Sequence, residues 1–391
     1  MHGGKRMNKG IWTKKYLWAV LVLLCVHAGP YLLLPVITVY GRMLSGSDTL
    51  AGMMASVFAL SGLFARFLSA YLLDRMPVKK VLQLFTAAMA AASFLYIFSN
   101  AYWQAFVLRG LQGFFYGVTC TAMSTYIVRL LDPADRLEGI GYSSLTGNLA
   151  NAVCPTISYA LLGPDVNRFR WLFTAVFLSV VISFLMMIPI SGNVQGRQES
   201  KVTGSAAGNI SAILVPFLTW VCMSFSLSSV SAFLSLSALE KGFAGIGLYF
   251  TCNVAGLVTS RVVMRKMMDI IGEKRMICGM IITIALSLCG IALSSDVRQL
   301  YVIGLAVGFA NGCLAPMINT KMVNSLPDSA GGFANAAFFA AGDIGFIIGP
   351  TFWGMIAGIL NYQSVFIAAS CIGIPALGMQ MFAEEKRRHS K

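Results

Sequence analysis

Apolar runs of 18 or more residues follow one another along almost the whole chain, and this pattern restricts the possible folds more than any other feature. A helix needs about 20 apolar residues to cross the hydrocarbon core of a bilayer. Twelve runs occur, at residues 16–40, 50–73, 81–98, 102–128, 140–162, 170–190, 210–239, 246–268, 275–293, 299–323, 332–360 and 363–382. Because backbone polar groups in lipid must be satisfied within the segment, the runs predict an all-α polytopic membrane protein with twelve transmembrane helices.

The composition agrees with a membrane protein. Only 11% of the 391 residues are charged and 57% are hydrophobic, whereas about 25% of the residues in a soluble domain are charged. The first run begins after MHGGKRMNKGIWTKK and has no small-residue cleavage site after it. We therefore interpret it as a retained helix, not a signal peptide, in a protein of the cell membrane.

The basic residues predict the orientation. Of the 29 Lys and Arg residues, 21 fall in the segments on the N-terminal side of the membrane, five on the other side and three within helices. Cytoplasmic loops are enriched in Lys and Arg, so we expect both termini in the cytoplasm. The net charge of +14 is spread over these loops and forms no separate basic domain, so we expect no nucleic-acid partner.

Several classes of function lack their sequence signatures. The nine cysteines are scattered singly, and only three histidines accompany them, which predicts no metal site. Neither a G-x-x-x-x-G-K-[ST] phosphate loop nor an H-E-x-x-H motif occurs. We therefore expect neither an enzyme nor an ATP-driven pump, and no cofactor.

The second half of the chain repeats the first after a shift of 195 residues. The shift superposes residues of matching type, as follows: Arg66 on Arg261, Asp74 on Asp269, Lys79 on Lys274, Lys80 on Arg275, Gly52 on Gly247, Gly113 on Gly308, Gly117 on Gly312, Gly147 on Gly342 and Pro155 on Pro350. Two six-helix repeats in the same orientation follow. We expect an N-terminal bundle at 1–190, a polar, glycine-rich cytoplasmic linker at 191–209, and a C-terminal bundle at 210–391.

Local motifs add a family resemblance over essentially the whole chain. After the second run, Asp74, Arg75, Lys79 and Lys80 match the pattern G-x-x-x-D-R-x-G-R-K, although Ala and Pro replace its glycines. LRGLQGFFYG supplies the R-x-x-Q-G of the fourth helix, and GNLANAVCP keeps a Gly and a Pro of the glycine-rich antiporter motif, with Cys where Gly is usual. The sequence resembles the major facilitator superfamily, and more loosely its bacterial drug- and sugar-efflux permeases.

The resemblance and simple electrostatics suggest roles for some residues. A carboxylate at a helix end can face the positive N-terminus of a neighbouring helix and form a breakable latch. The gating candidates are Asp74, Arg75, Lys79, Lys80, Asp269, Lys274 and Arg275. Alternatively, they only set the topology. Proline removes a backbone hydrogen bond and small residues allow close helix contact. Gly147, Pro155, Gly342 and Pro350 are therefore hinge candidates, with simple packing as the alternative.

Asp343 is an acid near the middle of the run 332–360, in FFAAGDIGFIIGP. A charge at the bilayer centre costs roughly 2.5–3.5 kcal/mol on insertion scales, so it faces protein or water. Its repeat-related residue is Asn148. Buried carboxyl groups can exchange protons near neutral pH, which makes Asp343 the first candidate for proton coupling. Structural pairing with an arginine or a neighbouring helix, and binding of a cationic substrate or sodium, remain open.

Other polar and aromatic residues are weaker candidates. His27 lies at a similar depth and titrates near neutral pH, or is a packed group. Arg109 occupies the position of an arginine that the resemblance links to proton transfer; alternatively it binds an anionic group. Seven further residues are candidates for the substrate cavity: Tyr31, Tyr116, Tyr126, Asn148, Trp220, Phe225 and Asn311.

Together these features predict a secondary active transporter that works by alternating access. We expect a monomer that exports a small organic compound and uses the proton gradient as its driving force. A proton-coupled importer of a small polar solute and a lipid-handling carrier of the same fold are the alternatives.

Overall fold

The computed structural model describes residues 11–132, 135–162, 168–190, 211–326 and 331–389, and within these ranges it contains helices and no strand. The helices are α1 (Lys14–Leu33), α2 (Ile37–Ser45), α3 (Asp48–Arg75), α4 (Val78–Tyr96), α5 (Tyr102–Leu130), α6 (Arg136–Leu162), α7 (Phe169–Met187), α8 (Ser211–Glu240), α9 (Gly247–Ile271), α10 (Glu273–Leu293), α11 (Val297–Asn324), α12 (Gly331–Ile359), α13 (Tyr362–Cys371) and α14 (Gly373–His389). The predicted all-α fold is confirmed.

Fourteen helices correspond to twelve passes because the first and last passes are each broken once. Residues 34–36 separate α1 from α2, and this break contains Pro35, whose ring blocks the hydrogen bond of a continuing helix. Ile372 separates α13 from α14. We call the face where α1 starts and α14 ends the terminal face. The opposite face, which holds the α2–α3, α6–α7, α8–α9 and α12–α13 connections, is the distal face.

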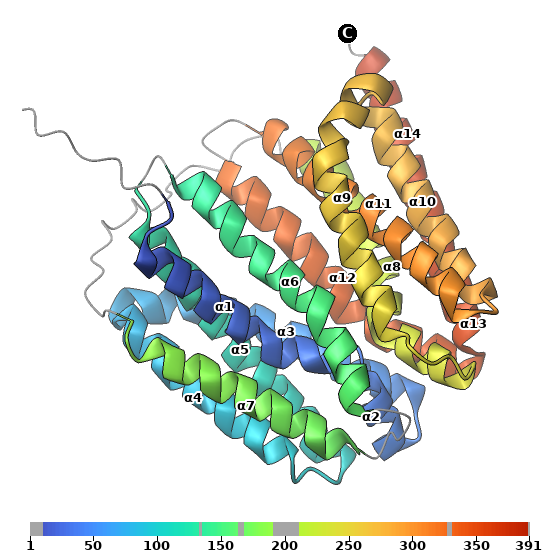
Figure 1. Cartoon of the computed structure of the whole chain (residues 1–391). Helices are drawn as coiled ribbons and strands as arrows, with labels where there is room; N and C mark the ends of the chain where they lie inside the picture. Colours follow the sequence, from blue (N-terminus) through green and yellow to red (C-terminus); the bar gives the residue numbers. More distant parts are fainter. Residues whose placement is uncertain (1–10, 133–134, 163–167, 191–210, 327–330, 390–391) are drawn as a thin grey trace, which may run out of the picture.

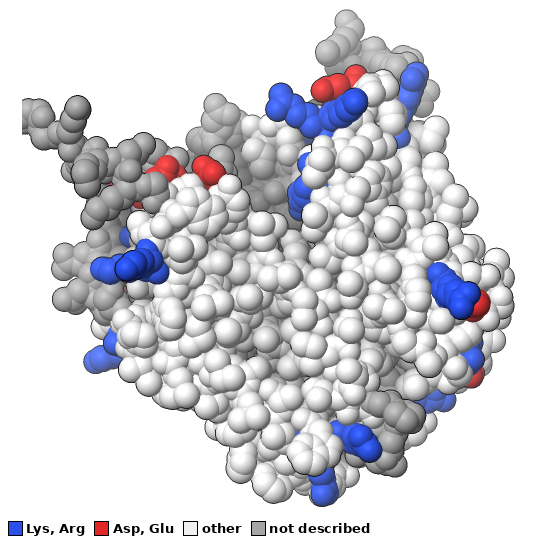
Figure 2. Space-filling model, in the orientation of Figure 1, with Lys and Arg blue, Asp and Glu red and all other residues white. Residues whose placement is uncertain are grey.

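Not all twelve passes are strongly apolar. Within the described residues, nine segments are long and apolar enough to cross a membrane, counting α1 with α2 and α13 with α14 as one segment each. The helices α5, α6 and α9 are long enough, with 29, 27 and 25 residues, but more polar. In Figure 2, charged side chains lie toward the edges of the face shown, and its broad middle is almost free of them.

The helices pack as two groups with the same internal arrangement (Figure 1). In the first, α3 packs on α5, and α1 packs on α6 and α7; in the second, α9 packs on α11, and α8 packs on α12. Glycines bring the repeat-related pairs together: a Cβ at Gly113 would overlap the backbone of Phe58, and one at Gly308 would overlap that of Asn253. The expected close helix contacts are therefore present. The predicted linker at 191–209 lies outside the described residues.

Candidate functional site between the two bundles

The two groups of helices meet along two seams, one between α3 and α12 and one between α6 and α9. In Figure 1, α6 and α9 converge toward the distal face and diverge toward the terminal face. Hydrogen bonds mark the convergence: Thr251 donates to the carbonyl of Ala152 at 3.2 Å, and its hydroxyl lies 3.0 Å from that of Thr156. These residues occupy the distal halves of both helices, so this seam is closed on the distal side.

The α3–α12 seam is closed on the same side. Ser56 of α3 accepts hydrogen bonds from the backbone N–H and the hydroxyl of Thr351, at 3.2 and 2.8 Å. A Cβ at Gly354 would lie 2.5 Å from the carbonyl oxygen of Asp48. Only glycine permits this approach of the two backbones.

The hinge candidates lie at equivalent places in the two seams. Pro350 of α12 presents its carbonyl oxygen to Gly52, where a Cβ would overlap it. Pro155 of α6 and the following Thr156 pack on Gly247, whose Cβ would lie 3.0 Å from Cα of Thr156. The repeat thus relates the two Gly–Pro contacts to each other, and both prolines lie inside continuous helices. Gly147 and Gly342 lie deeper, near His27 and Trp220 respectively.

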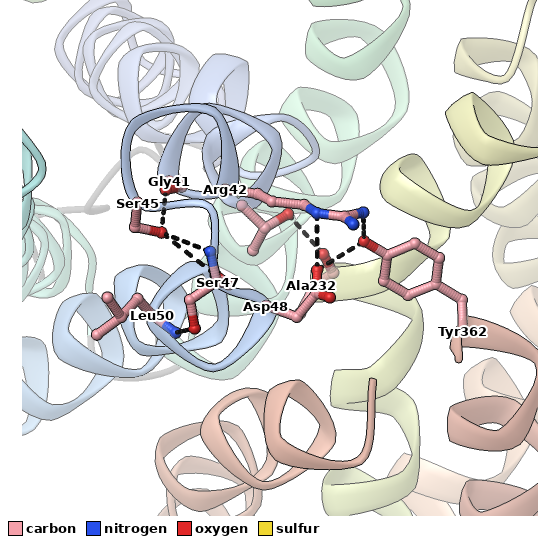
Figure 3. A network of polar contacts seen from close by, with 9 residues as sticks. Gly41, Arg42, Ser45, Ser47, Asp48, Leu50, Ala232 and Tyr362 are labelled. Atoms are coloured by element: carbon pink, nitrogen blue, oxygen red, sulfur yellow. Dashed lines mark hydrogen bonds and ion pairs between the residues drawn. The ribbon is translucent and has the colours of Figure 1, made fainter. Parts of the chain in front are cut away.

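A polar network covers the distal end of the α3–α12 seam (Figure 3). Arg42 of α2 forms an ion pair with Asp48 of α3, with 3.2 Å between Nε and Oδ1. Tyr362 of α13 donates to Asp48 at 2.6 Å and accepts a hydrogen bond from Arg42. Nearby, Thr38 donates to the carbonyl of Ala232 at 2.5 Å. The network joins the two bundles through residues that the sequence analysis did not select.

Asp343 forms an ion pair with Arg66 across the α3–α12 seam. The Nη1 atom of Arg66 lies 2.5 Å from Oδ2 of Asp343, and the two side chains are 51% and 24% exposed. Arg66 is ten residues beyond Ser56 along α3, toward the terminal face. Among the polar contacts between the bundles in the described part of the chain, this pair lies farthest from the distal face. The structure thus supplies the arginine partner that one interpretation of Asp343 required, while its role in coupling remains a prediction.

His27 belongs to a polar cluster inside the first bundle. Its Nδ1 lies 2.7 Å from the hydroxyl of Tyr116, and the ring of Tyr31 meets the imidazole edge-on at a centroid distance of 5.9 Å. Gly117, the residue after Tyr116, packs on Ala65, the residue before Arg66. Two sequence candidates of the cavity, Tyr31 and Tyr116, are therefore gathered around His27, and this cluster adjoins the Arg66–Asp343 pair.

Arg109 is fully buried within the first bundle. It donates to Gln112 at 2.7 Å, and its guanidinium lies 4.1 Å from the ring centroid of Phe58. Its Nε and Nη2 atoms have no hydrogen-bond partner within the described chain. A cation–π contact partly offsets the missing hydrogen bonds. In this conformation Arg109 is thus enclosed by the first bundle and takes no part in the Arg66–Asp343 ion pair.

The remaining cavity candidates are dispersed. Tyr126 is packed in the apolar core of the first bundle near the terminal face. Trp220 stacks on Phe338 with 4.9 Å between ring centroids, and Phe225 packs on Trp353. Asn311 has a buried Oδ1 atom without a partner in the described residues. Asn148 is half-buried in α6.

The gating candidates all lie at the terminal face. Asp74, Arg75, Lys80, Asp269, Lys274 and Arg275 are exposed, and Lys79 is half-buried. Lys79 donates to the carbonyl of Ile188 at 2.9 Å, within its own bundle, and Arg75 lies over the ring of Tyr71. Asp74 and Asp269 have no hydrogen-bond or ion-pair partner within the described residues. Among the described residues, the aspartates of the expected latch therefore have no polar partner in this conformation.

Two bundles related by a repeat, with cross-bundle contacts on one face and ionisable groups at mid-depth, define a membrane transporter. The sequence matches the family model of the Major Facilitator Superfamily over residues 19–244 and 211–391, so the chain belongs to this family of transporters and is not an enzyme.

Similar proteins span almost the whole chain. The Staphylopine export protein of Staphylococcus aureus (strain Mu50 / ATCC 700699) is 18% identical, covering 97% of this chain and 98% of that protein. The Multidrug resistance protein MdtG of a Rahnella species (strain Y9602) is 22% identical over 97% and 95%. A bacterial homologue of the human lysosomal transporter Spinster, solved in an inward-facing and unoccupied conformation, has a TM-score of 0.79 at 11% identity, covering 96% and 98%. This likeness confirms the fold.

Proposed function

We propose that the protein exports a small organic compound by proton-coupled alternating access. The observation that carries the proposal is the Arg66–Asp343 pair, a carboxylate that ties the two bundles together at mid-depth. Within the described residues, the other hydrogen bonds between the bundles lie nearer the distal face. Such an arrangement suits one end state of a transporter, closed on one side of a central site.

The orientation follows from the distribution of basic residues. If the terminal face is cytoplasmic, as the excess of Lys and Arg on that side predicts, the distal closure faces the exterior. The structure is then the inward-facing state. Export requires this state to accept substrate from the cytoplasm, and the disengaged aspartates at the terminal face suit that step.

The ion pair suggests how a proton could be coupled to the transition. A deprotonated Asp343 attracts Arg66 and holds α3 against α12, which favours the inward-facing state. A proton on Asp343 removes that attraction and favours separation of the helices on the distal side. A ligand can shift such an equilibrium only by binding one state better than the other. Release of the proton to the cytoplasm would therefore stabilise the inward-facing state, which accepts the next substrate for export.

The names of two relatives support export, since one is an export protein and the other a multidrug resistance protein. Both are distant, so the substrate is proposed only as a small organic molecule. We infer that the transporter acts as a monomer in the cell membrane, without a cofactor. Uptake of a polar solute is the second candidate. A pH gradient of either sign, imposed on liposomes containing the oriented protein, tests the direction of transport.

Thiol labelling tests the orientation. Cysteines introduced at the exposed residues Asn100, Gly245 and Asn361, in a background without the nine native cysteines, are expected to react with impermeant reagents from outside intact cells. Cysteines at Met76 and Gly196 are expected to react only after the cells are opened, because positions 76 and 196 are placed in the cytoplasm. Labelling of position 196 from outside would overturn the twelve-pass topology.

We also propose that the gating residues close the terminal face in the opposite state. Asp74→Asn is then expected to leave folding intact, lower the transport rate and shift the population toward the inward-facing state, because a carboxylate can bind a helix N-terminus that an amide binds less well. Spin-label distances across the terminal face measure the population. Unchanged distances together with an unchanged rate would leave Asp74 a marker of topology only.

A further inference from the structure

The two seams are related by the repeat but are not electrically equivalent. The shift of 195 residues that relates the bundles places Arg66 on Arg261 and Asn148 on Asp343. At the α3–α12 seam, Arg66 forms an ion pair with the carboxylate of Asp343. At the α6–α9 seam the corresponding residues are an arginine and a neutral amide. The charge of Arg66 is thus balanced by an acid on the other bundle, whereas the repeat gives Arg261 no such acid.

The position of Arg261 on α9 follows from the contacts of its neighbours. Gly247 and Thr251 face α6, whereas Leu257 and Ser260 face α11, where they contact Gly312. At about 100° per residue, Arg261 lies between these two faces of the helix. The contact of Ser260 with Gly312 parallels that of Ala65, the residue before Arg66, with Gly117 of α5.

Arg261 is exposed and has no hydrogen-bond or ion-pair partner within the described part of the chain. It lies ten residues before the end of α9, which is about 15 Å along the helix axis. A cation in lipid at such a depth costs several kcal/mol, so charged residues inside transmembrane segments face protein or a water-filled opening. Because the polar contacts of this seam lie nearer the distal face, the guanidinium is placed on the side that opens toward the terminal face.

An acceptor on α11 lies near the same region. Asn311 precedes Gly312, which packs on Ser260 beside Arg261, and its Oδ1 atom is buried without a partner among the described residues. Asn311 is the repeat counterpart of Tyr116, which lies beside His27 in the first bundle. A buried acceptor that lacks a donor has lost its hydration without compensation. A ligand bound to Arg261 could supply a donor to it.

We propose that the opening between the bundles binds an organic anion, whose carboxylate, sulfonate or phosphate group is held by Arg261. This inference rests on the proposed function, because the anion is taken to be the transported compound. A guanidinium binds such groups through two parallel hydrogen bonds. Arg109 is less suited to this task, because it is fully buried and bonded to Gln112. Asn311 adds a preference for a substituent that donates a hydrogen bond.

Equilibrium binding with matched probes tests the proposal without a proton gradient, so that a failure of proton coupling does not affect the result. Naphthalene-2-carboxylate and naphthalen-2-ylmethylammonium share one ring system and carry opposite charges. We expect the purified protein in neutral-lipid nanodiscs to bind the carboxylate at least tenfold more tightly. Arg261→Gln is expected to abolish this preference, Arg261→Lys to retain part of it, and Arg265→Gln, a matched loss of charge one turn away on α9, to leave it unchanged.

A second variant tests the geometry. Asn148→Asp gives the α6–α9 seam an acid equivalent to Asp343 of the α3–α12 seam. The new carboxylate is expected to pair with Arg261, which weakens binding of the probe carboxylate at least tenfold and raises the unfolding temperature. Neither stabilisation nor further weakening is expected when Arg261→Gln is also present. Absence of saturable carboxylate binding, or an equal preference in Arg261→Gln, would overturn the proposal. Competition by phosphatidylglycerol in the nanodiscs would support the anion site and identify a lipid headgroup as its occupant.

Discussion

Asp343→Asn is expected to abolish transport driven by a proton gradient while substrate exchange across the membrane continues. The variant keeps the size of the side chain but removes both its titration and its ionic attraction to Arg66, 2.5 Å away. Asparagine already occupies the repeat-related position, Asn148, so the variant is expected to fold and reach the membrane. The measurement compares gradient-driven uptake with counterflow in liposomes containing equal amounts of protein.

Three further variants separate coupling from structure. Asp343→Glu keeps a titratable group and is expected to retain some coupling with a shifted pH profile. Asp132→Asn removes an exposed acid and is expected to behave like the wild type. If Asp343→Asn fails to express and Arg66→Gln rescues it, the pair serves mainly to hold the bundles together, because removing one partner leaves an unbalanced charge.

Full gradient-driven transport by well-folded Asp343→Asn would rule out Asp343 as the proton carrier. His27 would then be tested next. It is a titratable group inside the first bundle, and its Nδ1 lies 2.7 Å from the hydroxyl of Tyr116.

The second large effect is expected from Gly52→Ala. A Cβ at this position would overlap the carbonyl oxygen and carbon of Pro350, so α3 and α12 must separate at the distal face. We expect a shift toward the outward-facing state, with longer distances between spin labels at Met43 and Leu360 and shorter ones between Asp132 and Asn324. Each tenfold change in the ratio of the two states corresponds to about 1.4 kcal/mol.

Gly62→Ala is the matched control on the same helix. Both substitutions gain the same helix propensity, about 1 kcal/mol, but a Cβ at Gly62 would lie 3.6 Å from the nearest atom, the carbonyl oxygen of Gly113, at ordinary contact distance. At the other seam, a Cβ at Gly247 would lie 3.0 Å from Cα of Thr156, a closer contact than at Gly62 but a looser one than at Gly52. Gly247→Ala is therefore expected to shift the two states in the same direction as Gly52→Ala, but by less. Wild-type distances in Gly52→Ala would show that this contact does not control the seam.

The outline of the fold could be predicted from the sequence because each part of it depends on local or periodic features. Run length predicts a transmembrane helix whatever surrounds it, and the shift of 195 residues shows the repeat directly. The glycines of α5 and α11 likewise indicated close packing, because a missing side chain is a property of the residue itself. The breaks near Pro35 and at Ile372 were missed because the flanking runs remain apolar through them.

The partners of the charged residues were decided by the tertiary structure alone. Asp343 had three candidate arginines inside helices, and only the crossing of α3 and α12 brings Arg66 to it. The contact between Arg42 and Tyr362 joins residues 320 positions apart, and no spacing in the sequence relates them. An ion pair requires two atoms within about 4 Å, whereas composition and periodicity locate a residue only along and around its own helix. The sequence therefore determined which ionisable groups enter the membrane, and the packing of the two bundles determined which of them meet.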